Sequence, residues 1–274
     1  MPESTPLRNL TAARRKRSSA GSRPSEWGSA WRRSARRWES LASQIASATG
    51  WRVWNPGRYG ERWHSLFRSL YPVQEEGILI FGLNPGPYGM AQTGIPFTDL
   101  KRLEAQLPAL AGAIRRRAGP LRLPGLAPRS LHPFLSRTFE SSSVRVYRFL
   151  LLGWGNAERG WREVAVANGC SLLFIDPSGK NRTPADLYAA ASRVTRNREA
   201  ARQILERCLR ARRLAARDAV RALSPKGVVL LGKDTQNALG EEMKRLVGEA
   251  RILGWEHPTR AVPDPWARGL LAEI

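Results

Sequence analysis

Residues 77–97 read GILIFGLNPGPYGMAQTGIPF, an apolar run followed at once by a loop rich in proline and glycine. An apolar run without alternation predicts a strand covered on both faces, as in a parallel sheet between two layers of helices. Similar runs occupy 171–176 and 227–232. A fourth, at 249–254, begins with charged residues and is expected at the sheet edge. We therefore predict an α/β fold, a three-layer α/β/α sandwich around a short four-stranded parallel sheet.

One segment of helical periodicity precedes these strands, and another lies between the runs at 171–176 and 227–232. In residues 26–48, three tryptophans, a leucine and an isoleucine recur at helical spacing, which predicts a helix with one buried face. Residues 184–223 are also helical in pattern, with Thr183 as the N-cap and Asp186 completing a capping box. Because a single helix of this length is improbable, we expect a break at Asn197.

The rest of the chain has weaker patterns. Residues 103–117 predict a helix, and residues 119–133 predict an irregular loop because proline and glycine are frequent there. Residues 1–25 contain little apolar periodicity and are expected to form a disordered basic tail. Residues 26–274 are expected to form a single catalytic domain.

The composition excludes several classes of protein. Lys and Arg total 45 against 23 Asp and Glu, a net charge of +22 that favours binding to polyanions such as DNA. Two cysteines and three widely spaced histidines exclude a disulfide scaffold and the common zinc motifs. No apolar run approaches the ~20 residues of a membrane helix, and the N-terminus lacks the apolar core of a secretory signal.

Four residues are candidates for a site at the carboxyl ends of the strands, where open α/β sheets bind ligands. Asn84 is the first polar residue after the first apolar run, and Phe97 could present a flat ring to a planar ligand. Asn168 directly precedes the second run, and its amide can pair with an imide edge. His257 follows the fourth run. Taken singly, each also fits a tight turn or a surface position.

Taken together, these segments resemble a known family. The string NPGPYGMAQTGIPF at 84–97 looks like the first active-site motif of the single-strand-selective monofunctional uracil-DNA glycosylases, and His257-Pro258-Thr259 is similar to the second. Supporting matches lie at 53–56, 140–147 and 170–184, and the resemblance extends over residues 50–270. It implies a uracil-DNA glycosylase-like fold that cleaves the N-glycosidic bond of uracil in DNA, without a metal or an organic cofactor.

The resemblance assigns a role to each candidate. Asn84 would hold the attacking water, and His257 would donate a hydrogen bond to O2 of the departing uracil. Phe97 would stack on the flipped base, and Asn168 would pair with its N3 and O4 edge. Because an asparagine cannot act as a strong base, we expect a dissociative reaction in which the sugar cation forms largely before water attacks.

Two further positions concern the substrate range and the product. The family places Gly86 and Met90 near C5 of the base and accepts uracil with oxidised C5 substituents. Asp99, two residues after Phe97, is an alternative candidate for a catalytic group, but the motif favours Asn84. The lysine nearest to the motifs is Lys101, so a Schiff base is not expected, and the product should be an abasic site.

The sequence also departs from the family pattern. Ala167 and Ser171 stand where the family commonly has His and Pro, and the segment after Pro258 differs. Arg260 is our candidate for a wedge or phosphate clamp, and Lys180 for a phosphate contact. Alternative functions are excision of another deaminated base, such as xanthine or hypoxanthine, or nucleic-acid binding without catalysis.

The expected partners are single- and double-stranded DNA containing uracil. We expect no membrane association, and we expect a monomer. The protein should be cytoplasmic and nucleoid-associated in a bacterium, or nuclear in a eukaryote.

Overall fold

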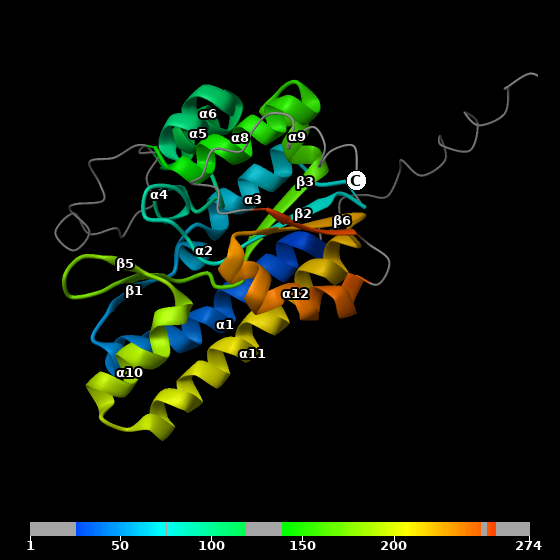
Figure 1. The fold of residues 1–274 in the computed structure, drawn as a ribbon. Coiled ribbons are helices and arrows are strands. Elements are labelled where there is room, and N and C mark those ends of the chain that lie inside the picture. The colour runs from blue at the N-terminus through cyan, green and yellow to red at the C-terminus, as the bar shows by residue number, and fades with distance from the viewer. Residues whose placement is uncertain (1–25, 75, 119–138, 248–250, 256–274) are drawn as a thin grey trace, which may run out of the picture.

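The computed structural model describes residues 26–74, 76–118, 139–247 and 251–255 (Figure 1). At its centre is a parallel sheet with the strand order β3-β2-β6-β7. β2, the first strand of this sheet along the chain, pairs with β3 on one side and with β6 on the other, so the strand order reverses beside β2. The strands are β2 (Ile78–Gly82), β3 (Val164–Asn168), β6 (Gly227–Leu231) and β7 (Arg251–Trp255).

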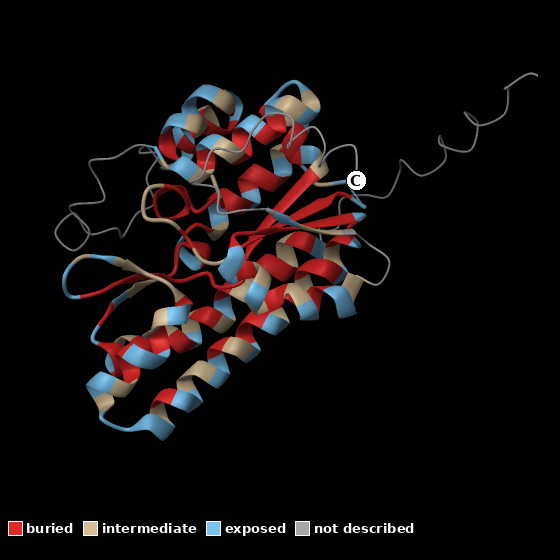
Figure 2. Cartoon of the chain, viewed as in Figure 1, coloured by how far each residue is buried: buried red, intermediate tan, exposed pale blue. Residues whose placement is uncertain are grey.

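Alternate residues of the central strands face two separate hydrophobic cores. In β2, Ile78 and Ile80 face one core and Leu79 and Phe81 face the other, and all four are buried. Figure 2 shows the central strands buried while the surrounding helices are buried on one side. The first core contains α3 (Glu61–Leu70), α5 (Leu100–Gln106), α6 (Pro108–Ala118), α8 (Ser141–Trp154) and α9 (Ala157–Glu163). The second contains α1 (Glu26–Thr49), α11 (Arg198–Leu223) and α12 (Lys233–Val247).

This arrangement confirms the α/β fold with a four-stranded parallel sheet, and β7 lies at an edge as predicted. One strand was assigned wrongly. The run at 171–176 belongs instead to a second, antiparallel sheet of order β1-β4-β5, and Val164–Asn168 takes its place in the central sheet. The strands of this small sheet are β1 (Arg52–Trp54), β4 (Leu173–Ile175) and β5 (Asn181–Arg182).

The assignment of 171–176 to the central sheet was wrong because two neighbouring segments are both buried and both lack an alternating apolar pattern. Both Val164–Asn168 and Leu173–Ile175 are fully buried. The second run is buried because Phe174 packs in a third core with α1, α10 (Leu187–Thr195) and α11 rather than between the main helical layers. Continuous apolar character indicates covered faces, but it does not say which sheet the strand joins.

The long helical segment breaks where expected. A short 3₁₀ turn, Pro184–Asp186, opens it, and the Thr183 amide donates to Asp186 Oδ2 at 2.9 Å, which completes the predicted capping box. Asn197 caps α11 by accepting from the amides of Glu199 and Ala200.

The predicted helix over 103–117 is instead two helices, α5 and α6, separated at Leu107. Pro108 disfavours helical backbone in the residue before it and removes an amide donor, so the helix ends there. The expected basic tail at 1–25 and most of the expected loop at 119–133 lie outside the described residues. Within the described part of the chain, no helix is long and apolar enough to cross a membrane.

Candidate active site

A cleft of about 510 Å³ opens at the carboxyl edge of the central sheet. Its walls come from the segments that follow β2 and β6, from the last residue of β3, and from the start of α8. The cleft therefore lies where the strand order reverses, the usual ligand position in such sheets, and its size is typical of small-molecule sites. Five predicted site residues line it: Asn84, Gly86, Met90, Phe97 and Asn168.

Asn84 is held in the cleft by weak contacts. Its Nδ2 donates to the carbonyl oxygens of Pro85 at 3.4 Å and Arg182 at 3.5 Å, both at the long end of the hydrogen-bond range. No bond to its Oδ1 is present among the described residues. The amide is therefore oriented by the loop and by β5, while one oxygen acceptor remains available for a water or a substrate group.

Phe97 adopts a strained backbone conformation beside the cleft. Its φ is +52°, in the left-handed region that non-glycine residues rarely occupy. A network around the preceding turn maintains this geometry, because Thr93 Oγ1 donates to the Thr98 carbonyl at 2.7 Å and accepts from the Ile95 amide at 3.2 Å. The surrounding structure thus fixes the position of a ring that would otherwise relax, as is common at functional sites.

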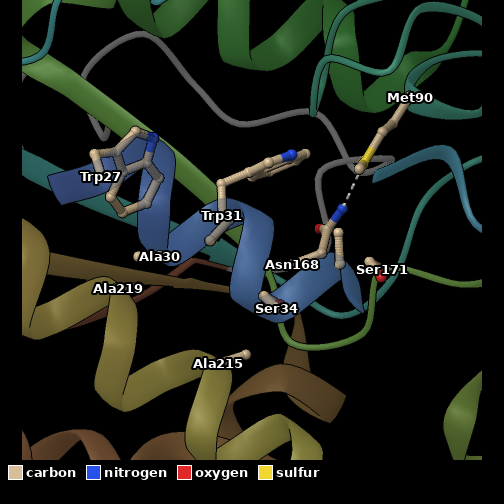
Figure 3. A pocket seen from close by; sticks show the side chains of 11 residues that line it. Trp27, Ala30, Trp31, Ser34, Met90, Asn168, Ser171, Ala215 and Ala219 are labelled. Atoms are coloured by element: carbon tan, nitrogen blue, oxygen red, sulfur yellow. Dashed lines mark hydrogen bonds between the residues drawn. The ribbon is translucent and has the colours of Figure 1, made fainter. Parts of the chain in front are cut away.

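The sequence predicts that Asn168 precedes a strand. In the structure Asn168 is instead the last residue of β3, and it is buried. Its Nδ2 donates to Met90 Sδ at 3.1 Å, shown as the dashed line in Figure 3. Its Oδ1 is buried and accepts no hydrogen bond from the described residues. A buried carbonyl oxygen without a donor is costly, so this atom is suited to accept from a ligand N–H.

A small cavity lies behind Asn168, between α1 and α11 (Figure 3). Its volume is about 20 Å³, room for about one water. Trp27 and Trp31 from α1 line it together with Met90 and Asn168, which also line the cleft. The amide that faces the cleft is thus backed by the first helix of the described chain.

Gly82 is a site residue that the sequence reasoning missed. A Cβ at this position would lie 2.5 Å from Asn168 Oδ1 and 2.6 Å from Phe97 Cζ. Only a glycine lets both side chains approach the end of β2. The apolar run around Gly82 gave no signal of this, because the two contacts come from residues distant in the sequence.

Glu140 was also missed as an individual site residue. It lines the cleft, and its carboxyl group lies so close to Gly86 and Gly89 that a side chain at either glycine would overlap it. Burial, together with the nearby Asp99 carboxylate, raises the pKa of Glu140 to about 7, although a hydrogen bond from Ser142 partly opposes the shift. A carboxyl group that changes charge near neutral pH therefore supports the loop that carries Asn84.

Asp99 has a structural position. It is fully buried, its Oδ1 accepts from the Arg102 amide at 2.8 Å, and its Oδ2 accepts from the Glu140 amide at 2.9 Å. Both oxygens are used to cap α5 and to hold the start of α8.

The remaining predicted residues lie elsewhere. Lys180 is exposed in the turn between β4 and β5, a hairpin whose Asn181 lines the cleft. His257 and Arg260 fall outside the described residues, although β7 ends at Trp255 on the same edge of the sheet as β2 and β6. Within the described ranges, no group of three or more His, Cys, Asp or Glu residues could hold a metal ion.

Comparison with known proteins agrees with this geometry. The model of the uracil DNA glycosylase superfamily matches residues 69–266, from the end of α3 to beyond β7. This chain belongs to the uracil DNA glycosylase superfamily. The match covers the cleft and both motif regions, and it confirms the resemblance inferred from the sequence.

Two relatives show where this chain belongs within the uracil DNA glycosylase superfamily. The chain is 29% identical over 218 residues to the single-strand selective monofunctional uracil-DNA glycosylase of Rattus norvegicus, covering 77% of this chain and 69% of that protein. It is 30% identical over 218 residues to the Bos taurus protein of the same name, covering 77% of this chain and 71% of that one.

A solved structure shares the fold. The crystal structure of SMUG2 from Pedobacter heparinus aligns with a TM-score of 0.55 at 22% identity, over 82% of this chain and 87% of that one. The fold alone follows from this structure, whereas the 30% identity to the Bos taurus protein over 71% of its length shows that the chain belongs to the single-strand-selective monofunctional family.

Proposed function

We propose that this protein excises uracil from DNA by hydrolysing the N-glycosidic bond and leaves an abasic site. The observation that carries the proposal is the meeting of Asn84, Phe97 and Asn168 in one cleft at the point where the strand order reverses. These side chains offer a water-holding amide, a flat ring and an acceptor that the described residues leave unpaired, and a pocket for an extruded uracil needs such groups.

The chemistry follows from these groups. The flipped uracil stacks on Phe97, and its N3–H donates to Asn168 Oδ1. The C1′–N1 bond breaks with its electron pair moving to the base, and water held by Asn84 adds to C1′. The proton that this water loses balances the charge of the departing uracil anion, which leaves as neutral uracil. No strong base is required, because the sugar cation forms before water bonds to it.

The charge that develops on uracil O2 needs a donor. By resemblance we assign this role to His257. A preorganised donor of this kind stabilises a transition state by about 3–4 kcal/mol. We also propose that uracils with oxidised C5 substituents are accepted, because the resemblance places Gly86 and Met90 beside C5.

Binding to DNA is assigned to the strongly basic chain as a whole. Lys180 lies in the exposed turn beside the cleft and is suited to contact a phosphate. Arg260 has the same role by resemblance. We propose that the protein acts as a monomer on single- and double-stranded DNA, a state that size-exclusion chromatography with light scattering would test.

The deciding experiment is incubation with oligonucleotides that each carry one deaminated base, followed by alkali to cleave abasic sites. We expect uracil strands to be cut, equally well with EDTA present. Asn84→Ala should lower the rate about 100-fold or more while DNA binding survives, because a mispositioned water has a cost of that order. Asn237→Ala, an exposed asparagine on α12, is the matched control and should remain within about twofold.

Three outcomes would contradict the proposal. Cutting of xanthine or hypoxanthine strands instead of uracil strands would change the substrate. Binding without turnover on every strand would leave only a nucleic-acid-binding protein. Full activity of Asn84→Ala would remove the assigned role of that side chain.

A further inference from the structure

An aromatic pair lies on the surface beside the cleft. Trp54 at the end of β1 and Tyr59 at the end of α2 (Pro56–Tyr59) stack with ring centroids 4.0 Å apart and planes 4° apart. Trp54 covers one side of the Tyr59 ring, yet Tyr59 is 48% exposed. The Tyr59 ring is therefore held flat by Trp54 while about half of its surface remains accessible to a ligand.

Tyr88 connects this pair to the cleft. It lines the cleft, and it packs with Trp54 in a small apolar cluster built on Leu173 and Ile175 of β4. In the small sheet, Trp54 pairs with Leu173 and Arg52 with Ile175, so the side chains of Trp54 and Arg52 share one face. The three aromatic residues Tyr88, Trp54 and Tyr59, here called the aromatic surface, therefore extend outward from the cleft.

The aromatic surface is held rigidly. Asn55, buried between Trp54 and α2, donates from Nδ2 to the Ala35 carbonyl at 2.9 Å and to Glu39 at 2.8 Å. Its Oδ1 accepts from Ser171 at 3.0 Å. One amide thus ties β1 and α2 to α1 and to the connection that follows β3.

A backbone contact fixes α2 against the active-site loop. A Cβ at Gly60 would lie 2.5 Å from the Cα of Gly94, so the end of α2 directly touches the end of α4 (Met90–Thr93). A rigid, preorganised surface loses little conformational entropy when a ligand stacks on it.

The surroundings are basic. Arg52 is exposed on β1 and Lys180 in the turn between β4 and β5, and Lys180 forms no ion pair within the described part of the chain. Arg58, beside Tyr59, is exposed and pairs with Glu61 at 2.8 Å. Flat rings among cations match the requirements of a single nucleic-acid strand, whose bases stack while its phosphates contact the cations.

We propose that the aromatic surface stacks unpaired bases that neighbour the excised nucleotide on the same strand. The proposal rests on the function proposed above, because it places the excised base in the cleft. In a duplex the neighbouring bases stack on one another and pair with the opposite strand, so their faces are not available. The aromatic surface would therefore favour single-stranded substrates through base stacking, without selecting a particular sequence.

The test compares variants of Tyr59 in the full-length protein on a single-stranded oligonucleotide with one uracil. Tyr59→Ala should raise KM about tenfold with kcat within about twofold, because it removes one base-stacking contact. Tyr59→Leu should behave similarly, since leucine covers Trp54 but offers no flat face, and Tyr59→Phe should match the parent protein. Tyr188→Ala on α10, where Tyr188 is 40% exposed, is the matched control and should have no effect.

A second substrate isolates stacking. When the nucleotides beside the uracil are replaced by tetrahydrofuran analogues, which lack a base and resist alkali, the phosphates remain but the bases are lost. Tyr59→Ala should then equal the parent protein. An unchanged KM on the ordinary strand would overturn the proposal. Equal loss on the abasic-flanked strand or on duplex DNA would overturn it as well.

Binding separates this proposal from the proposed function. The affinity for a uracil-free single strand, measured by fluorescence anisotropy, should also fall about tenfold in Tyr59→Ala. This measurement needs no excision. If Tyr59→Ala binds the strand more weakly but the parent protein excises no uracil, only the proposed function is contradicted. If Tyr59→Ala excises uracil and binds the strand as tightly as the parent protein, only the aromatic surface is contradicted.

Discussion

The protonation state of one residue of the cleft, Glu140, affects the stability of the folded protein. Its carboxyl group lies against Gly86 and Gly89, and its pKa is raised to about 7, mainly by burial. The folded protein therefore binds this proton more tightly than the unfolded chain does. Between pH 4.5, the ordinary value, and about pH 7, stability should fall as the pH rises, because ionisation is penalised only in the folded state.

Glu140→Gln should remove this penalty. We expect the variant to be more stable than the parent protein at pH 8, by roughly 1–3 kcal/mol, and nearly equal to it close to pH 4. The measurement is urea unfolding across this pH range. A Glu206→Gln variant, which removes the same charge from the exposed face of α11, is the control. A stability difference that does not depend on pH would contradict the assignment.

The sequence predicted those site residues that lie in continuous motifs. The motifs predict Asn84, Phe97 and Asn168 as site residues, and the structure brings the three side chains to one cleft. Gly82 and Glu140 were not identified individually, because their significance depends on contacts between segments far apart in the chain. A glycine inside an apolar run carries no sign of the side chains that approach it in space.

At the scale of elements, Asp99 joins two helices on one side of the cleft. One carboxylate oxygen caps α5 and the other accepts the amide of Glu140, next to the first residue of α8. Phe97 lies two residues before Asp99, and Glu140 contacts the glycine loop. The capping of α5 is therefore coupled to the shape of the active site.

Asp99→Ala should lower the free energy of unfolding by about 2–4 kcal/mol, because it removes a helix cap and leaves the Glu140 amide without its acceptor. Asn156→Ala provides a matched comparison. Asn156 caps α9 through one exposed hydrogen bond of 2.8 Å to Arg159, and its loss should cost only about 1 kcal/mol. Denaturant unfolding measures both. Equal losses would show that the link from Asp99 to Glu140 contributes nothing.

Elements that are marked by a local chemical signal could be predicted from the sequence, and elements that depend on distant contacts could not. The break at Asn197 was found because an N-cap residue has a local chemical role. The assignment of 171–176 to the central sheet was wrong, because two buried runs lie close together and only strand pairing decides between them. Local chemistry can be inferred from sequence, whereas the choice of partner strand depends on the whole fold.

At the scale of the whole molecule, we expect the net charge of +22 to determine the affinity for DNA and the cleft to determine which base is excised. The charge favours any polyanion, while the groups that line the cleft are largely uncharged. Affinity for DNA should therefore depend on salt, and discrimination between uracil and normal bases should not.

Raising the salt from 50 to 200 mM should weaken binding to a single strand roughly 20- to 50-fold, as expected for about three or four phosphate contacts. The ratio of kcat/KM for uracil and for undamaged cytosine strands should change by less than about twofold. Anisotropy titrations and excision assays across the salt series measure the two quantities. A discrimination ratio that falls in parallel with affinity would contradict this separation of tasks.

The packing of α1 on α11 also determines when the site can form during synthesis. These helices back Asn168 together, and they are joined by the ion pair between Arg33 and Asp218, at 3.4 Å and 185 residues apart in the chain. A ribosome completes α1 early but must translate nearly to β6 before its partner emerges. Contacts between such distant segments also form slowly during folding. We therefore expect the nascent chain to be unable to recognise uracil until most of the protein has left the ribosome.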